Sequence, residues 1–384
     1  MNKSRLTATI LSISLLTVMA GAAVAPALGA VRDYFSDANP LLVQMVVSMP
    51  ALFIILTNFC FPLLCRHLRT RTLSIVGLLL YVAAGAGAFF ADNIVSLLVF
   101  RALLGVSVGM LMPLSTGLLA YYFAPQEMAR LMGLSAAMNQ MGGVVATLLA
   151  GVLSSIAWNY AFLVYLLGLA ALVMVVLYLP NEHLQPSASA KAGTMAVLKP
   201  FHPSVVGMLL LMTIFFVYPT NFALVARSLG WSPTWITGVM VGLDVVAFFV
   251  GLAFGKLMST FRVIIKYFAP IGFLIGYGVM ALCPTAVGLM AGSVLIGLAN
   301  GVGVPYLNTI AGIKGGKDST TTVMPMLSAA LYLGQFVSPL IVMPTALYCF
   351  PCNPSGVWCV AVGLCLLFLL QTFLTRKFHR LPPE

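Results

Sequence analysis

The chain has 384 residues, of which 61% are hydrophobic and only 7% are charged, and its mean hydropathy is +1.07. Soluble domains carry about 25% charged residues, so this composition excludes a soluble enzyme or binding domain as the bulk of the chain. The net charge of +11 does not indicate a nucleic-acid binder, because the positive residues form short clusters between apolar runs. The composition predicts an all-α integral membrane protein, since lipid cannot satisfy unpaired backbone groups.

Twelve apolar runs are long enough to cross a bilayer, which takes about 20 residues per helix. In chain order, the predicted spans are 7–30, 41–64, 72–90, 94–121, 132–155, 160–179, 204–226, 235–257, 264–283, 286–312, 322–347 and 357–375. The first run follows a charged start, as a signal peptide does. It is too long for a typical signal peptide and is interpreted as a retained span.

A polar connection separates the sixth span from the seventh. Residues 181–203 are rich in Pro, Ser, Ala and Lys, a composition that is typical of a linker. The sequence therefore predicts two pseudo-symmetric six-helix bundles, 1–180 and 204–384, joined by a cytoplasmic linker. The second bundle is expected to end in a short cytoplasmic tail.

The distribution of positive residues predicts the orientation. Sixteen Lys and Arg residues fall in the predicted inner loops and tails, against two, Arg32 and Arg227, in the outer loops. Cytoplasmic loops carry the excess of positive charge, so both termini are expected in the cytoplasm and the chain in the cell inner (plasma) membrane. All four histidines fall on the same inner side, so none is a good candidate for carrying protons within the membrane.

A stripe of small residues recurs in the two halves. The fourth and tenth spans share one spacing at a distance of 192 residues: Gly105, Gly109 and Pro113 against Gly297, Gly301 and Pro305. Residues four apart share a helix face, so the glycines let a neighbouring helix approach closely and the proline bends the helix. The alternative is that both residue types are common in membrane helices. The repetition favours a duplicated bundle with a packing and hinge role for this stripe.

The segments "VFRALLGVSVGMLMP" and "MAGAAVAPALGAV" carry a family resemblance. The first looks like the fourth-span motif of the major facilitator superfamily (MFS), and the second like the first-span motif of its twelve-span drug:proton antiporter group. The resemblance covers the whole chain. It implies the MFS fold, transport rather than enzymatic activity, and a role of Arg101 in proton transfer.

Two other family motifs are incomplete. The loop after the second span has Arg66 where the family has an aspartate that helps to latch the inner gate, so the latch must differ. The fifth-span motif of exporters has a glycine followed, after three residues, by Gly-Pro. Here Gly142 is followed by Ala146 and Thr147, so the direction of transport stays open at this point.

One carboxylate falls well inside a predicted span. A charge such as Asp244 costs about 2.5–3.5 kcal/mol at bilayer depth, so an acid there is usually functional. The hypothesis is that Asp244 and Arg101 serve proton coupling or gating, with Asp244 carrying the coupling proton or pairing with a cationic substrate. The alternatives are that Asp244 only hydrogen-bonds a neighbouring helix and that Arg101 extends to the headgroups.

A set of uncharged polar residues is predicted to line a substrate cavity. Its members are Gln44, Asn139, Gln140, Tyr218, Asn221, Asn300, Tyr306, Asn308, Tyr332 and Gln335. Methionines near them would suit varied apolar ligands. Hydrogen bonding between helices is the alternative for each residue.

The functional prediction is a secondary transporter working by alternating access, with proton-coupled efflux of small amphiphilic compounds or drugs. Proton-coupled uptake of a small metabolite is one alternative, and a lipid flippase or a non-transporting sensor is another. The expected partners are a small-molecule substrate, protons and membrane lipids, without nucleic acid, and the chain is expected to be a monomer. No cofactor or metal is expected, and for Cys349 and Cys352 free thiols or one disulfide are favoured over a metal site.

Overall fold

The computed structural model describes residues 3–24, 31, 34–36, 38, 40–154, 156–183, 199–231, 233–262, 264–315, 323–350, 355–376 and 378. Every regular element within these residues is a helix. Twelve stretches of the described chain are long and apolar enough to cross a membrane. The predicted all-α membrane fold with twelve spans is confirmed.

The helices follow the predicted spans closely. The first half contains α1 (Lys3–Ala22), α3 (Pro40–His67), α4 (Thr70–Gly87), η2 (Ala88–Phe90), α5 (Ile94–Tyr122), α6 (Pro125–Ser154), η3 (Trp158–Leu167) and α7 (Gly168–Tyr178). The second half contains η5 (Lys199–Phe201), α9 (His202–Phe215), α10 (Val217–Ser228), α11 (Pro233–Phe261), η6 (Ile265–Tyr267), α12 (Phe268–Leu282), α13 (Ala286–Gly315), α14 (Val323–Cys349) and α15 (Gly356–Leu374).

The chain divides into two compact units. Unit 1 comprises Met1–Ala124, Met138–Leu198 and Lys314–Ala329, and unit 2 comprises Pro125–Ala137, Lys199–Ile313 and Ala330–Glu384. Three helices are therefore divided between the units. The first part of α6 belongs to unit 2, and the last two residues of α13 and the first part of α14 belong to unit 1. The bundles 1–180 and 204–384 stay a prediction, and most of the linker 181–203 lies outside the described residues.

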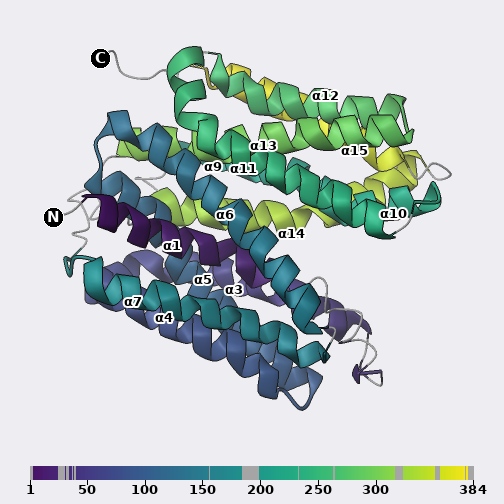
Figure 1. Cartoon of the computed structure of the whole chain (residues 1–384). Coiled ribbons are helices and arrows are strands. Elements are labelled where there is room, and N and C mark those ends of the chain that lie inside the picture. The colour runs from purple at the N-terminus through teal and green to yellow at the C-terminus, as the bar shows by residue number, and fades with distance from the viewer. Residues whose placement is uncertain are drawn as a thin grey trace. The chain divides into compact units, whose positions relative to one another are not determined.

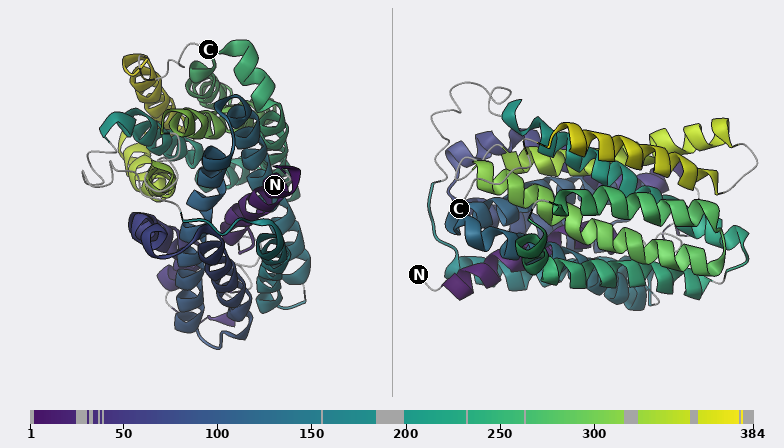
Figure 2. Two further views of the ribbon diagram at one scale, coloured as in Figure 1. Left: turned by 90° about the vertical axis from the view of Figure 1, so that its left-hand side faces the viewer. Right: turned by 90° about the horizontal axis from the view of Figure 1, so that it is seen from above.

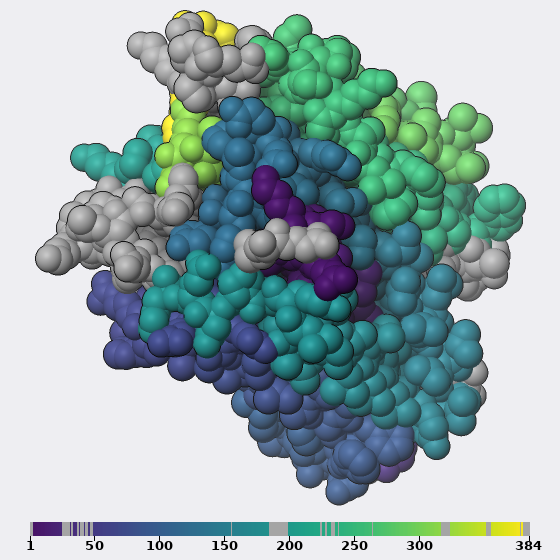
Figure 3. Space-filling view, turned by 60° about the vertical axis from the view of Figure 1, so that its left-hand side comes forward, coloured from purple at the N-terminus to yellow at the C-terminus, as the bar shows by residue number. Residues whose placement is uncertain are grey.

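In unit 1, α5 packs against α1, α3 and α4, and α4 packs in turn against α7 and η3 (Figure 1). Helix α5 is apolar on all sides, which is typical of a helix surrounded by others. The start of α1, purple in the space-filling view, lies against teal atoms of α7 (Figure 3). There the Arg5 guanidinium lies 5.4 Å from the centre of the Tyr178 ring.

In unit 2, α12 and α15 run side by side, and both pack against α9 (Figure 2). Helix α10 packs against α11 and, more lightly, against α9 and α15. Helix α13 is buried along most of its length, as α5 is in unit 1.

The seventh span, predicted as one helix, is broken into α9 and α10. Pro219 lies just after the break and has no N–H to donate to the preceding turn. Side chains of other helices donate to the carbonyls around the break. Tyr277 Oη donates to Ile214 O at 2.7 Å, and Ser338 Oγ donates to Thr213 O at 2.7 Å. The break is therefore a stable feature whose backbone groups are satisfied.

The glycine stripe brings backbones close together in the same way in both units. A Cβ atom added to Gly105 would lie 2.5 Å from Pro50 O, and one added to Gly297 would lie 2.7 Å from Leu243 O. The second glycines meet the same partner helices one turn further on: Gly109 against α3 and Gly301 against α11. Both contacts are too close for any side chain, so these helix pairs depend on glycine at these positions.

Candidate functional site: two polar centres related by the repeat

Arg101 is buried in the interior of unit 1, with only 1% of its surface exposed. Its guanidinium donates three hydrogen bonds of 2.8 Å each: from Nε to Val46 O, from Nη1 to Tyr165 Oη and from Nη2 to Ala20 O. One side chain on α5 thus joins α1, α3 and η3. We call Arg101, Tyr165 and these two carbonyls the unit 1 polar centre.

The carbonyls of Val46 and Ala20 have no hydrogen-bond donor within their own helices. Val46 O would accept from residue 50, but that residue is Pro50 and has no N–H. Ala20 lies in the last turn of α1, where carbonyls lack partners within the helix. Tyr165 Oη also donates to Ala20 O, at 2.9 Å. The guanidinium therefore completes the backbone hydrogen bonding of two helix segments and lies at the negative end of the α1 dipole.

This geometry decides between two interpretations of Arg101. A side chain that extends to the headgroups would be exposed at its tip, whereas Arg101 is enclosed by protein. The three acceptors of its hydrogen bonds are neutral groups. Its predicted part in proton coupling stays a prediction, while its contact with three helical elements of unit 1 is a property of the structure.

In unit 2, Ser293 occupies the position that the repeat assigns to Arg101. Ser293 Oγ donates to Leu289 O at 2.7 Å and lies 2.9 Å from Tyr218 Oη. Because the single proton of the serine hydroxyl is used within α13, Tyr218 is the donor of the second bond. A hydroxyl pair thus replaces the buried cation of unit 1.

Asp244 lies on the part of α11 that packs against α13 near Ser293, because the carbonyl of its neighbour Leu243 faces Gly297, one turn further along α13. Asp244 is half-buried, and its carboxylate is within electrostatic range of the Tyr218 phenol. Tyr218 also stacks on Phe222, with ring centres 4.6 Å apart. We call Tyr218, Ser293 and Asp244 the unit 2 polar centre. It brings together two of the residues singled out from the sequence and adds Ser293.

Aromatic pairs support both centres at corresponding positions. Tyr81 packs edge-on against Tyr165 at 5.5 Å, and Tyr277 stacks on Trp358 at 5.8 Å. Tyr165 and Trp358 are related by the repeat, 193 residues apart. The two differ in hydrogen bonding, because Tyr165 bonds to Arg101 whereas Trp358 Nε1 is buried with no partner.

Three predicted cavity residues have defined surroundings. Asn139 Oδ1 accepts from Thr17 Oγ1 at 2.8 Å, which joins α6 to α1 within unit 1. Asn221 Nδ2 donates to Val217 O of its own helix at 2.9 Å. Asn300 is 7% exposed, and its Oδ1 has no hydrogen-bond partner. Asn300 is thus the one of these three with a free acceptor inside the protein.

The other members of the predicted set are less informative. Four are half-buried: Gln140, Asn308, Tyr332 and Gln335. The side chain of Gln44 lies outside the described residues, as does Cys352. Cys349 has a free thiol, so the predicted state of the cysteine pair stays untested.

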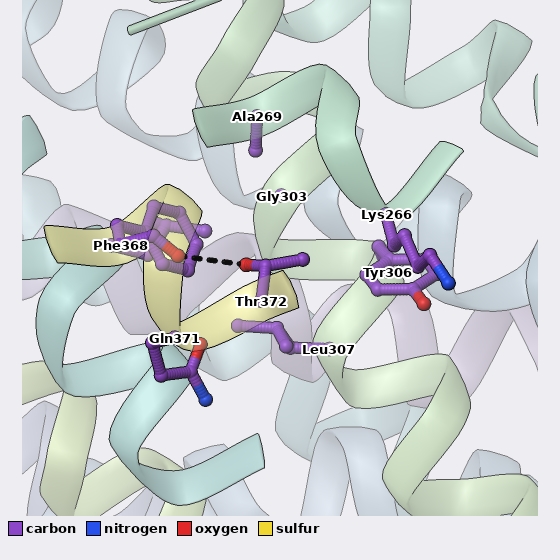
Figure 4. A pocket seen from close by; sticks show the side chains of 9 residues that line it. Lys266, Ala269, Gly303, Tyr306, Leu307, Phe368, Gln371 and Thr372 are labelled. Atoms are coloured by element: carbon purple, nitrogen blue, oxygen red, sulfur yellow. Dashed lines mark hydrogen bonds between the residues drawn. The ribbon is translucent and has the colours of Figure 1, made fainter. Parts of the chain in front are cut away.

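A small pocket in unit 2 lies between α9, α12, α13 and α15 (Figure 4). Of the predicted cavity residues, only Tyr306 lines it, together with Lys266, Gln371 and Thr372 among others. Gln371 Nε2 donates to Pro203 O at 3.0 Å. At 1.5 Å per residue, Tyr306 is about 20 Å along α13 from Ser293, so this pocket is separate from the unit 2 polar centre.

Sequence reasoning missed Tyr165, although a signal was present. An aromatic residue recurs at positions 165 and 358, at nearly the offset of the glycine stripe. Pro50 was a second signal, because a proline within a helix frees a carbonyl that a donor elsewhere must satisfy. Neither signal identifies Arg101 as the donor to the free carbonyls. Only the packing of α5 shows this.

Known proteins resemble this chain in sequence and in structure. Over 131 residues, it is 31% identical to the "Multidrug resistance protein B homolog" of Mycobacterium tuberculosis, a match covering 34% of this chain and 24% of that protein. The chain thus matches about a quarter of the length of this curated relative.

Two solved structures share the fold. The human organic anion transporter MFSD10 (TETRAN) aligns with a TM-score of 0.81 at 16% identity, covering 97% of this chain and 99% of that one. The proton:xylose symporter XylE aligns with a TM-score of 0.81 at 13% identity, covering 97% and 96%. The Major Facilitator Superfamily model matches residues 10–339. The chain therefore belongs to the Major Facilitator Superfamily, which is a family of membrane transporters and not of enzymes.

Proposed function

We propose that the chain is a proton-coupled secondary transporter that works by alternating access and exports small amphiphilic compounds. The observation that carries this proposal is the position of Asp244 on α11, where its neighbour Leu243 packs against Gly297 of α13 and its carboxylate is within electrostatic range of the Tyr218–Ser293 hydroxyl pair. A charged carboxylate inside a membrane is costly, so both its protonation and its pairing with a cationic group are favoured there. Asp244 is the residue to which we assign the transported proton.

Arg101 has a different part in this proposal. It holds α1, α3 and η3 to α5, so that these elements move as one body while a substrate site near the membrane midplane changes access. The bodies that rock are proposed to be 1–180 and 204–384, hinged at the glycine and proline stripes. Pro113 and Pro305 lie within helices that continue past them.

The proposed setting follows from the family and the charge pattern. Positive residues concentrate on one predicted side, which supports cytoplasmic termini and an inner-membrane location. The name of the mycobacterial relative supports amphiphilic drug-like substrates. Asn300, with its free buried acceptor, would receive a hydrogen bond from a substrate donor. Protons and lipids are the other proposed partners of a monomeric chain.

The proposal is tested with purified protein in liposomes under an imposed pH gradient. Asp244→Asn should reduce gradient-driven accumulation of a transported dye about tenfold or more, because the neutral amide cannot exchange a proton. The ligand-induced rise in melting temperature should persist. Asp92→Asn is the matched control, since Asp92 is exposed and lies between η2 and α5. Normal gradient-driven transport by Asp244→Asn would refute the assignment.

Proton-coupled uptake is a second candidate, favoured by the missing Gly-Pro after Gly142 in α6. The sign of substrate flux relative to the proton gradient, in vesicles of known orientation, separates the two. Export predicts that the substrate moves against the proton flow, and uptake predicts that the two move together.

A further inference from the structure

The pocket of unit 2 combines polar and apolar lining. Lys266 of η6 and Tyr306 of α13 lie side by side, with the nitrogen of one and the oxygen of the other close together (Figure 4). Gln371 and Thr372 line the pocket from the last turn of α15. The remaining lining is apolar and consists of Leu211, Ala269, Gly303, Leu307 and Phe368.

One part of the pocket carries hydrogen-bond donors. Lys266 Nζ lies 5.2 Å from the centre of the Tyr267 ring, and the Tyr267 phenol is within electrostatic range of Tyr306. Tyr306 is 5% exposed, and Lys266 and Tyr267 are half-buried. An ammonium has three N–H groups and a phenol has one O–H group. We call these three residues the donor cluster.

The α15 side of the pocket offers acceptors instead. Thr372 Oγ1 donates its single proton to Phe368 O at 2.9 Å, and Gln371 Nε2 donates to Pro203 O at 3.0 Å. The hydroxyl oxygen of Thr372 and the carbonyl oxygen of Gln371 thus remain to accept hydrogen bonds. The pocket therefore suits a ligand that accepts strongly at one end and donates at the other.

The charge and the size of the pocket restrict the ligand further. Lys266 is charged, and no described residue of the lining is acidic. Lys266 and Tyr267 directly precede α12, where the helix dipole favours an anion. The pocket and its mouth enclose about 250 Å³, less than the roughly 300–1,000 Å³ of drug-sized sites, so the pocket suits a small anionic group.

We propose that this pocket binds a phosphate group that has a hydroxyl close to it. The phosphate oxygens accept from the donor cluster, and the hydroxyl donates to Gln371 or Thr372. Lysine is a common phosphate ligand, and hydrogen bonds between ionised groups are roughly twice as strong as neutral ones. The inference does not depend on the direction of transport or on proton coupling.

Two sources supply such a group on the side that the positive residues predict to be cytoplasmic. One is the headgroup of an anionic lipid with free hydroxyls, and the other is a soluble phosphate. Leu370 and Leu374, on either side of Gln371 on α15, are 53% and 71% exposed. Exposed apolar residues of this kind mark a surface that lipid covers, so a headgroup lies within reach of the pocket.

The test follows the unfolding temperature of the full-length protein in neutral detergent, because a ligand that binds only the folded state raises it. Phosphatidylglycerol carries a phosphate and free hydroxyls. Phosphatidylcholine carries the phosphate with a quaternary ammonium in place of hydroxyls, and sodium phosphate supplies the ion without a lipid. Sodium chloride at equal ionic strength controls for screening. Titration with each probe gives an apparent dissociation constant.

Phosphatidylglycerol or sodium phosphate should raise the unfolding temperature, and phosphatidylcholine should not. Lys266→Gln should weaken binding about tenfold or more, because it removes the charged donor. Tyr306→Phe should weaken binding about three- to tenfold through the loss of one hydroxyl. Lys256→Gln is the matched control, since Lys256 is an exposed residue of α11 outside the pocket lining. It should bind as the unmodified protein does.

A rise with phosphatidylglycerol alone that Lys266→Gln weakens supports the lipid source, and an equal rise with sodium phosphate supports the soluble one. Equal rises with the two lipids would overturn the proposal, as would no rise with any probe or equal affinities of Lys266→Gln and Lys256→Gln. Tyr306→Phe removes a single oxygen, so it keeps the test decisive if Lys266→Gln fails to fold. The readout requires no transport, so its failure is distinguishable from a failure of the proposed function.

Discussion

The two polar centres occupy corresponding places in the internal repeat but differ in charge. The unit 1 polar centre holds a buried cation whose hydrogen bonds go to two backbone carbonyls and a phenol. The unit 2 polar centre holds a hydroxyl pair with a carboxylate within electrostatic range. A guanidinium with three hydrogen bonds to three helical elements holds those elements together, whereas a carboxylate can bind and release a proton. The difference teaches that corresponding positions of the repeat can carry different chemistry, with a structural cation in unit 1 and, in our proposal, a proton carrier in unit 2.

The largest expected effect is a loss of stability when Arg101 of the unit 1 polar centre is replaced. Arg101→Leu would leave Val46 O and Ala20 O without their charged donor and should lower the free energy of unfolding by at least about 3 kcal/mol. Arg101→Lys should fall between Leu and the native residue, because an ammonium cannot match the planar fork. Thermal unfolding in detergent measures both. Unchanged stability with lost transport would instead place Arg101 in the proton chemistry.

The next effect tests whether the glycine next to each polar centre packs against its partner helix in the same way in the two units. Gly105→Ala and Gly297→Ala each force a Cβ against a carbonyl oxygen of the partner helix, at 2.5 Å and 2.7 Å. Each should destabilise the protein by about 1–3 kcal/mol through overpacking. Gly238→Ala is the control, since no atom lies within 4 Å of its added Cβ. If only one of the two variants lost stability, the two units would not share the same helix packing at these glycines.

The smallest effect sharpens the contrast between the two tyrosines. Tyr165→Phe removes one bond to Ala20 O and one acceptor for Arg101, and Tyr218→Phe removes the bond to Ser293. Tyr218→Phe should cost about 1 kcal/mol of stability, and Tyr165→Phe about 2 kcal/mol, because it also takes an acceptor from a charged group. Only Tyr218→Phe should alter the pH dependence of transport, because Asp244 acts electrostatically on Tyr218 and not on Tyr165. Identical pH profiles for both variants would argue against a chemical role for the unit 2 polar centre.

Much of the fold could be predicted from local patterns. Twelve apolar runs predicted twelve spans, and the ends of most helices agree within a few residues. The third, sixth and ninth spans each combine a 3-10 and an α-helical segment, and the seventh is broken into α9 and α10. Pro219 gave the signal for that break, but length and hydropathy hid it. Hydropathy records whether a segment fits in lipid, and it is insensitive to a single missing hydrogen bond.

The sequence by itself determined that this chain is helical, spans a membrane and contains a repeated stripe, because composition and spacing act locally along the chain. Only the tertiary structure decided that Arg101 meets carbonyls 55 and 81 residues away, or that Asn58 meets Ser328 at a separation of 270. Such partners depend on which helix faces meet. A periodic sequence shows that a helix has an apolar face. Which other helix packs against that face depends on the packing of the whole chain.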